Sequence, residues 1–299
     1  MRLVGLLRGR PVRDVVVWCV LGAAAGYGAV AGGGGRDDEP VSGSGIAAPA
    51  AGAALGPARG QEGASARRAA VARRWGLAAP PLRAPKPPSE KPDLVPARRA
   101  GGRELPAVVS RVPTDQRVVF LTIDDGDDKD PEFVRMMREL DVPYSAFLSH
   151  YLAKEDYGYF RGMQKLGTGL HNHTLNHPFL PGLDAAGQRK EICGQQRNLR
   201  RETGRRPRLF RPPYGEYTAQ TLRIARSCGI RVVPLWTQEV FPDRMDHGGA
   251  DRRLHPGDII LTHFRGRGDW PGSMPDVARR VLRTATEQGF ALARLEDYV

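Results

Sequence analysis

The sequence predicts an α/β fold with a parallel sheet, most simply a (β/α) barrel of about seven parallel strands. Strand-like and helix-like segments alternate from about residue 116 to residue 299. Parallel strands need a long crossover between them, usually a helix, so this alternation is typical of a parallel sheet. Polar residues also follow several of the strand-like runs, which is where barrel folds carry their chemistry.

The predicted strands are short apolar runs rich in β-branched residues, a composition that fits a buried pleated surface. They cover residues 118–123, 144–149, 168–172, 209–211, 230–236, 258–263 and 290–294. The helices predicted between them cover residues 131–140, 155–166, 184–202, 218–227 and 275–288. Gly204, Gly229 and Gly289 stand where three of these helices end, as glycine often does at a helix C-terminus.

The first 31 residues predict a secretory signal peptide or a signal anchor. Four arginines precede an uncharged apolar stretch over residues 15–31, which ends in a small-x-small sequence suited to cleavage. The stretch is rich in glycine and alanine and is at the short limit for a membrane span, so a cleaved signal is favoured over a membrane anchor. In both cases we expect the rest of the chain to be secreted or extracytoplasmic.

Residues 32–115 predict a disordered linker, and residues 116–299 predict the folded domain. The linker segment is rich in alanine, glycine, proline and arginine, with almost no aromatic residues and no sustained periodicity. Such a composition buries too little surface to offset the entropy lost when the chain becomes ordered.

The formal net charge of +12 comes mainly from arginine. A basic balance fits nucleic acid, anionic lipid or an anionic cell-wall polymer as a partner. No arginine-rich block is interleaved with aromatic residues, so we expect no nucleic-acid partner.

Two cysteines, Cys193 and Cys228, lie beyond the N-terminal apolar stretch. In an exported protein they could form a disulfide. The alternative is that both are small buried residues on separate helices, and the sequence alone does not give the distance between them.

Two acidic residues and two histidines predict a metal site. The apolar run 118–123 ends in Asp124-Asp125-Gly126, which places two carboxylates where the backbone turns away from the strand. Ionising two carboxylates this close together costs electrostatic free energy unless a cation lies nearby. His173 and His177 are four residues apart, so on a helical turn they share one side and can supply further ligands. We therefore expect a bound cation, with one carboxylate left for acid–base chemistry.

Four short motifs follow one another along the chain: Thr122-Ile123-Asp124-Asp125-Gly126, His173-Thr174-Leu175-Asn176-His177-Pro178, Arg211-Pro212-Pro213-Tyr214-Gly215 and Leu261-Thr262-His263. Together they resemble the motifs of the polysaccharide deacetylases, the carbohydrate esterase family that carries the NodB-homology domain. The resemblance covers residues 116–299 and implies a distorted (β/α) barrel. It also implies hydrolysis of N-acetyl groups on N-acetylglucosamine residues of an extracellular or cell-wall polysaccharide.

The resemblance implies that Asp125, His173 and His177 are the metal ligands. Two imidazoles and one carboxylate leave coordination positions open, as a hydrolytic metal requires. The expected metal is zinc, with cobalt or another transition metal as the alternative, because the same ligand set suits several ions.

The resemblance also implies a catalytic role for four other residues. Asp124 is the expected general base, and Arg211 is expected to keep this carboxylate ionised and aimed. The backbone N–H of Tyr214 is expected to help hold the oxyanion. His263 is the expected general acid that protonates the leaving amine.

One segment departs from the family pattern. After this strand the family usually has Asp-x-x-Asp-Trp, whereas residues 236–243 are Trp-Thr-Gln-Glu-Val-Phe-Pro-Asp. Glu239 is the candidate for the first acidic position, which in the family orients and tunes the acid histidine. The departure leaves open a carbohydrate-binding module of the same fold with weakened catalysis. An esterase acting on O-acetyl groups also stays open, because the same water and base would serve it.

Overall fold

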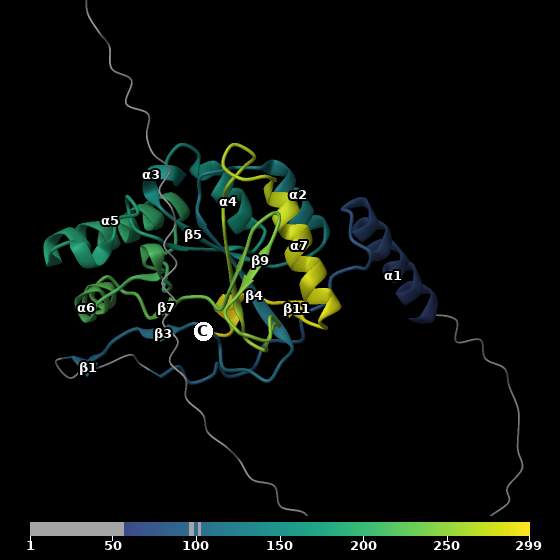
Figure 1. The fold of residues 1–299 in the computed structure, drawn as a ribbon, viewed down its shortest axis with the longest axis horizontal. Coiled ribbons are helices and arrows are strands. Elements are labelled where there is room, and N and C mark those ends of the chain that lie inside the picture. The colour runs from purple at the N-terminus through teal and green to yellow at the C-terminus, as the bar shows by residue number, and fades with distance from the viewer. Residues whose placement is uncertain (1–56, 96–98, 101–102) are drawn as a thin grey trace, which may run out of the picture. The chain divides into compact units, whose positions relative to one another are not determined.

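The computed structural model of the chain describes residues 57–95, 99–100 and 103–299 (Figure 1). The predicted signal or anchor over residues 1–31, and the first part of the predicted linker, lie outside the described residues. Within the described ranges, no helix is both long enough and apolar enough to cross a membrane.

The central sheet consists of parallel strands in the order β6-β5-β4-β10-β8, with β9 added antiparallel at the β8 edge. Their bounds are β4 (Val118–Asp125), β5 (Ser145–Leu148), β6 (Gly169–Asn172), β8 (Gln238–Val240), β9 (Met245–His247) and β10 (Ile259–His263). A further strand, β11 (Ala291–Leu292), pairs in parallel with the start of β4. Every residue of β4 is buried, as expected for a strand covered on both faces.

The predicted α/β fold is confirmed, but a closed barrel is not found among the described residues. Beyond β6 the sheet continues only as isolated bridges, from Asn172 to Phe210 and from Leu209 to Val232. Val232 belongs to β7 (Val232–Pro234), which pairs with β3 (Ala107–Val109) as a separate two-stranded sheet. The predicted strand 209–211 is reduced to bridges because two prolines follow it directly and cannot donate ladder hydrogen bonds.

Helices flank the sheet (Figure 1). They are α2 (Pro131–Glu139), α4 (Tyr157–Lys165), α5 (Ala185–Thr203), α6 (Ala219–Ser227) and α7 (Met274–Glu287), each within two residues of its predicted bounds. Alternate residues of β4 serve two different cores, as the twofold period of a strand requires. Val119 and Leu121 pack with α2, α4 and α7, whereas Val118 and Phe120 pack with β7 and β10.

A short hairpin and a single-turn helix have no clear sign in the sequence. The strands β8 and β9 form a hairpin of three residues each, too short to show a periodic pattern. The helix α3 (His150–Ala153) is a single turn directly after β5.

Residues 57–115 differ from the predicted disordered linker. The segment begins with an 18-residue helix, α1 (Pro57–Arg74), whose alanines and arginines are strong helix formers. Trp75, directly after α1, is buried in the same core as α2 and α7, and its Nε1 donates to Glu139 Oε2 at 2.7 Å. Lys91 Nζ donates to the backbone carbonyl of Glu296. A few anchoring contacts order this segment although its average composition is that of a linker, so the folded unit begins before residue 116.

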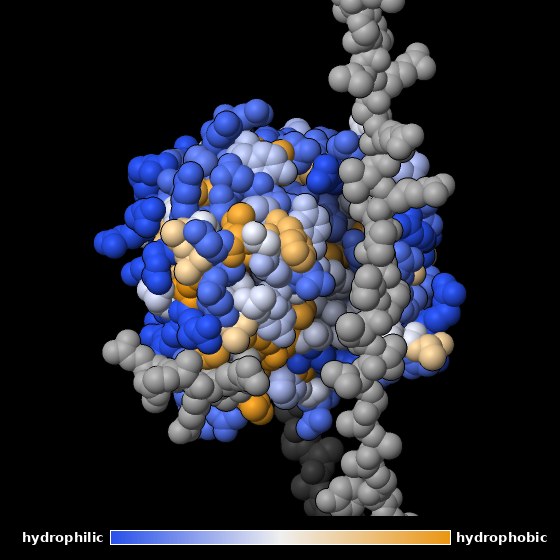
Figure 2. All heavy atoms as spheres, turned by 60° about the vertical axis from the view of Figure 1, so that its left-hand side comes forward, coloured by the Kyte–Doolittle hydropathy of each residue, from blue (hydrophilic) through white to orange (hydrophobic). Residues whose placement is uncertain are grey.

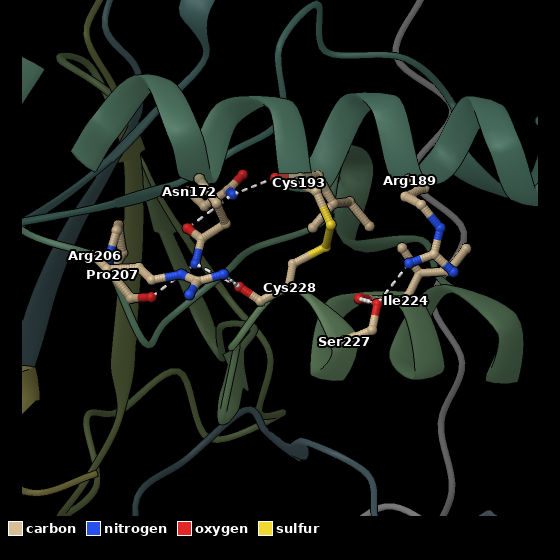
Figure 3. The surroundings of a disulfide bond; sticks show 10 residues. Asn172, Arg189, Cys193, Arg206, Pro207, Ile224, Ser227 and Cys228 are labelled. Atoms are coloured by element: carbon tan, nitrogen blue, oxygen red, sulfur yellow. Dashed lines mark hydrogen bonds between the residues drawn. A yellow bond between two sulfur atoms is a disulfide. The ribbon is translucent and has the colours of Figure 1, made fainter. Parts of the chain in front are cut away.

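A disulfide joins α5 to the turn after α6 (Figure 3). The Cα atoms of Cys193 and Cys228 are 5.1 Å apart, so the alternative of two separate buried thiols is wrong. Beside the disulfide, Gln196 Nε2 donates to the carbonyls of Pro207 and Cys228, and its Oε1 accepts from Asn172 Nδ2 at 3.1 Å. These bonds tie α5 to the end of β6, where the first metal-site histidine follows.

The solvent side of α5 is basic. Its exposed basic residues are Arg189, Lys190, Arg197, Arg200 and Arg201. The view from the left-hand side of Figure 1, where α5 and α6 lie, is mostly hydrophilic with small scattered hydrophobic areas (Figure 2). This side therefore resembles an ordinary solvated surface.

Candidate active site

The predicted site residues gather at the carboxyl ends of neighbouring parallel strands. Asp124 and Asp125 are the last residues of β4, and His263 is the last residue of β10, directly opposite Asp124 in the strand register. His173 follows the end of β6. Because the carboxyl ends of parallel strands meet at one edge of a sheet, residues far apart in sequence become neighbours here.

Asp125, His173 and His177 form the predicted metal cluster. One ligand atom from each residue lies within 4.8 Å of the others, a spacing that a single ion can bridge. Asp125 Oδ1 is 3.7 Å from His173 Nε2 and 3.6 Å from His177 Nε2. This oxygen is buried and has no hydrogen-bond partner, which is costly unless a cation or water satisfies it. His173 Nδ1 donates to the carbonyl of Arg211 at 2.7 Å, and this bond directs Nε2 toward Asp125.

The two histidines lie on a loop, so the prediction that they share a helical turn is wrong. Thr174 and His177 have positive φ angles of 73° and 55°. Thr174 N donates to Asn172 Oδ1, and His177 N donates to Thr174 Oγ1. Side-chain bonds of this kind compete with helical bonds, and Pro178 disfavours a helix at the residue before it. The loop nevertheless brings the two rings to a centroid distance of 4.9 Å.

Burial keeps both metal-site imidazoles neutral. It lowers the pKa of His173 and of His177 to about 4, although Asp125 opposes the shift in both. Burial alone would raise the pKa of Asp125, but the charges that His263, His173 and His177 carry once they are protonated in acid, together with Arg265, outweigh it and hold the pKa below its usual range. An ionised carboxylate beside two neutral imidazoles is the protonation state that a divalent metal requires.

Asp124 forms a buried ion pair with Arg211, as predicted from the motifs. Arg211 Nη1 donates to Asp124 Oδ1 at 2.7 Å, and both side chains are almost completely buried. The other guanidinium nitrogens donate to Thr122 Oγ1 and to the carbonyls of Pro234 and Leu235. Burial raises the pKa of Asp124 above its usual value, and Arg211 opposes that rise. A carboxylate with this environment is suited to accept a proton.

His263 lies beside Glu239, the candidate for the first acidic position of the family's Asp-x-x-Asp-Trp segment. Glu239 is in β8, opposite Leu261 of β10, and its Oε1 is 3.8 Å from His263 Nδ1. The two charges can therefore interact, although the separation exceeds a direct hydrogen bond. Burial lowers the pKa of His263, while the carboxylates of Asp125 and Asp124 oppose the shift.

Aromatic side chains border the cluster. Tyr214 is 61% exposed, has a φ of 62°, and its ring stands edge-on to His177 with centroids 4.7 Å apart. Tyr151 is 39% exposed, and Trp270 is edge-on to His263 at 6.2 Å. Exposed rings of this kind present apolar faces next to polar groups, as sugar-binding surfaces do.

Arg265 is a site residue that the sequence analysis missed. Its Nη2 donates to Asp125 Oδ2 at 2.9 Å. The sequence feature that could have identified Arg265 is its place two residues after His263, just beyond the end of a strand. His171, by contrast, takes no part in the cluster, since its Nε2 is 2.5 Å from Glu296 Oε1.

A carboxylate and two imidazoles placed next to an arginine-paired aspartate and a histidine define a class of site suited to metal-assisted hydrolysis. A family model described as polysaccharide deacetylase matches residues 111–233. An uncharacterized protein of Streptomyces coelicolor is 45% identical over 201 residues, which cover 66% of this chain and 79% of that protein. A chitooligosaccharide deacetylase of Azorhizobium caulinodans is 31% identical over 166 residues, which cover 52% of this chain and 77% of that enzyme.

A solved structure shares the fold. It is a peptidoglycan N-acetylglucosamine deacetylase, with a TM-score of 0.57 at 24% identity, and the match covers 64% of this chain and 92% of that one. With these relatives and the four motifs, the chain belongs to the polysaccharide deacetylase family, carbohydrate esterase family 4.

Proposed function

We propose that this protein is a metal-dependent deacetylase that hydrolyses N-acetyl groups on N-acetylglucosamine residues of a polysaccharide. The observation that carries the proposal is that two adjacent carboxylates, Asp124 and Asp125, have different surroundings. Asp125 has an unpartnered oxygen near both imidazoles. Asp124 has one oxygen on Arg211 and the other 3.6 Å from His173 Nε2, and it is not a member of the three-residue cluster. Relatives named as deacetylases of chitooligosaccharides and of peptidoglycan support this substrate class.

The residues present fit a divalent metal, most simply zinc, with cobalt as an alternative. Asp125, His173 and His177 would hold it, because their donor atoms converge and both imidazoles are neutral. When bound, such a metal supplies Lewis-acid polarisation of the acetyl carbonyl and lowers the pKa of the attacking water.

The remaining residues would move protons and hold charge. Asp124 would accept a proton from the attacking water, while Arg211 holds the carboxylate in place through its 2.7 Å bond. His263, on the neighbouring strand, would donate a proton to the sugar nitrogen as the amide carbon–nitrogen bond breaks. Glu239 would stabilise the protonated form of His263 from 3.8 Å. The backbone N–H of Tyr214 would donate to the developing oxyanion.

We further propose that the protein acts outside the cytoplasm on a cell-wall or other extracellular glycan. The signal-like pattern over residues 1–31 supports this location. The Cys193–Cys228 disulfide also supports it, because such bonds persist mainly in oxidising compartments. The exposed rings of Tyr151 and Tyr214 would give sugar units apolar faces to stack on.

The test is acetate release from N-acetylglucosamine oligomers by the purified protein with added zinc or cobalt. We expect release with the parent protein and at least about 100-fold slower release with Asp124→Asn, which retains the shape of the side chain but not its basicity. O-acetylated sugars tested in parallel distinguish an amide hydrolase from an esterase. A folded, metal-loaded protein that binds the oligomers without releasing acetate would refute catalysis and favour a binding module.

A further inference from the structure

Each of the two adjacent aspartates has its own arginine. Asp124 pairs with Arg211, and Asp125 pairs with Arg265, whose Nη2 is 2.9 Å from Oδ2. Both carboxylates are buried, with 3% of each side chain exposed, whereas Arg265 is 33% exposed. Arg211 belongs to a family motif, but no motif contains Arg265.

The two oxygens of Asp125 face different partners. Oδ2 accepts from Arg265, whereas Oδ1 has no hydrogen-bond partner and lies 3.6 Å and 3.7 Å from the two imidazole nitrogens. A carboxylate can offer a metal one oxygen or both. With Oδ2 engaged by a guanidinium, only Oδ1 is available to the side where His173 and His177 converge.

The backbone fixes Arg265 relative to Asp125. Phe264 N donates to the carbonyl of Asp124 at 3.0 Å, and Asp128 N donates to the carbonyl of Phe264 at 3.0 Å. The loop after β10 is thus joined to the loop after β4 immediately before Arg265. A second carboxylate, that of Asp127, is 3.7 Å from Arg265 Nη1 and helps to orient the guanidinium.

We propose that Arg265 is a positioning residue of the metal site that limits Asp125 to a single ligand oxygen. This inference rests on the proposed metal site. The guanidinium reserves Oδ2, so coordination positions stay open for water and for the acetyl oxygen. Its positive charge also draws electron density from Asp125 and opposes a cation on the other side of the carboxylate. Arg265 therefore lowers the affinity for the metal and at the same time leaves coordination positions open.

The sign of the effect on metal affinity separates this role from a merely structural one. Removing the guanidinium frees Oδ2 for the metal and removes a repulsive charge, and both changes strengthen binding. If Arg265 only held Asp125 in place, its removal would loosen the ligand and weaken binding, as loss of a supporting partner usually does.

The experiment compares Arg265→Met, Arg265→Lys and the matched control Arg267→Met. Arg267 is two residues further on, its side chain is 73% exposed, and its ion-pair partner is Asp276 rather than a site residue. Zinc affinity is measured by competition with a chelator, and the coordination number is followed by the visible absorption of bound Co²⁺, which weakens as more ligands bind. Circular dichroism and thermal unfolding verify that each variant is folded.

We expect Arg265→Met to bind zinc at least about tenfold more tightly than the parent and to show weaker Co²⁺ absorption. Arg265→Lys, which keeps the charge, is expected to remain close to the parent, and Arg267→Met to be unchanged. Equal or weaker zinc binding by folded Arg265→Met would overturn the proposal. A parent protein that binds neither metal would overturn the metal site itself, and this inference with it.

Discussion

Replacing Arg211 with methionine tests the buried ion pair at the centre of the site. Arg211 has no exposed surface and donates four hydrogen bonds, to Asp124, Thr122 and two backbone carbonyls. Methionine fills part of the volume but leaves Asp124 buried without its cation. Removing one partner of a buried ion pair costs about 3–5 kcal/mol. We therefore expect Arg211→Met to lose about this much free energy of unfolding in urea.

The same substitution has a predicted signature in the pH dependence of deacetylation. Arg211 opposes the burial that raises the pKa of Asp124, so its loss raises that pKa further. The base must be ionised, so the acidic limb of the rate profile moves to higher pH by at least about one unit. The carbonyl that accepts from His173 is a backbone group, so zinc affinity should change little.

Arg197→Met, on the exposed side of α5, is the matched control and should leave both stability and rate near the parent values. Adding Asp124→Asn to Arg211→Met should recover part of the lost stability, because it removes the unpaired charge. An Arg211→Met protein within about 1 kcal/mol of the parent and with an unshifted pH profile would refute the reasoning.

Three further predictions follow from the described contacts. Cys193→Ala/Cys228→Ala opens a loop with a sequence separation of 35 and should reduce the free energy of unfolding by about 4 kcal/mol in the chain-entropy estimate. Glu239→Gln removes a negative charge 3.8 Å from His263, which lowers the pKa of the acid and should move the alkaline limb of the rate profile down by up to about one pH unit. The metal-free protein should lose stability in urea as the pH falls from about 6.5 toward about 4. His173 and His177 have pKa values of about 4 in the folded protein, so over this pH range the unfolded chain binds more protons than the folded one. At about pH 5 the expected loss in free energy of unfolding is about 2 kcal/mol per histidine.

Each of these predictions has a contradicting outcome. A double cysteine variant with parent stability would show that the disulfide adds no constraint. Asp246→Asn, on the strand next to Glu239, is the control for the pH profile, and an equal shift in both variants would remove the specific role of Glu239. His177→Gln should reduce the acid loss of stability by the share of one buried histidine, so an unchanged loss would assign it to other groups such as His263.

The sequence predicted the elements whose pattern is long and regular. The helices over residues 131–140 and 275–288 have strong apolar faces and appear within two residues of their predicted bounds. Asp124, Asp125 and His263 were placed correctly because a strand that ends in a polar residue points to a strand-end site. The spatial meeting of Asp125 with His173 and His177 then followed from the family motifs.

The remaining features depend on contacts between distant residues. α1 and the segment after it are ordered by Trp75 and Lys91, whose partners lie far away in sequence, so average composition gave the wrong result. The left-handed conformations of Thr174 and His177 depend on side-chain bonds from Asn172 and Thr174, and a spacing of four residues alone suggested a helix. Arg265 was missed because its importance comes from a partner 140 residues away.

A calorimetric zinc titration of the parent and of single-site variants tests the central claim most directly. We expect one ion per chain, and at least about 100-fold weaker binding by Asp125→Ala, His173→Ala and His177→Ala. Asp124→Asn is the matched control and should bind zinc almost as tightly as the parent, because Asp124 is the base and not a ligand. Tight binding that survives in Asp125→Ala but is lost in Asp124→Asn would contradict the assignment of the two carboxylates.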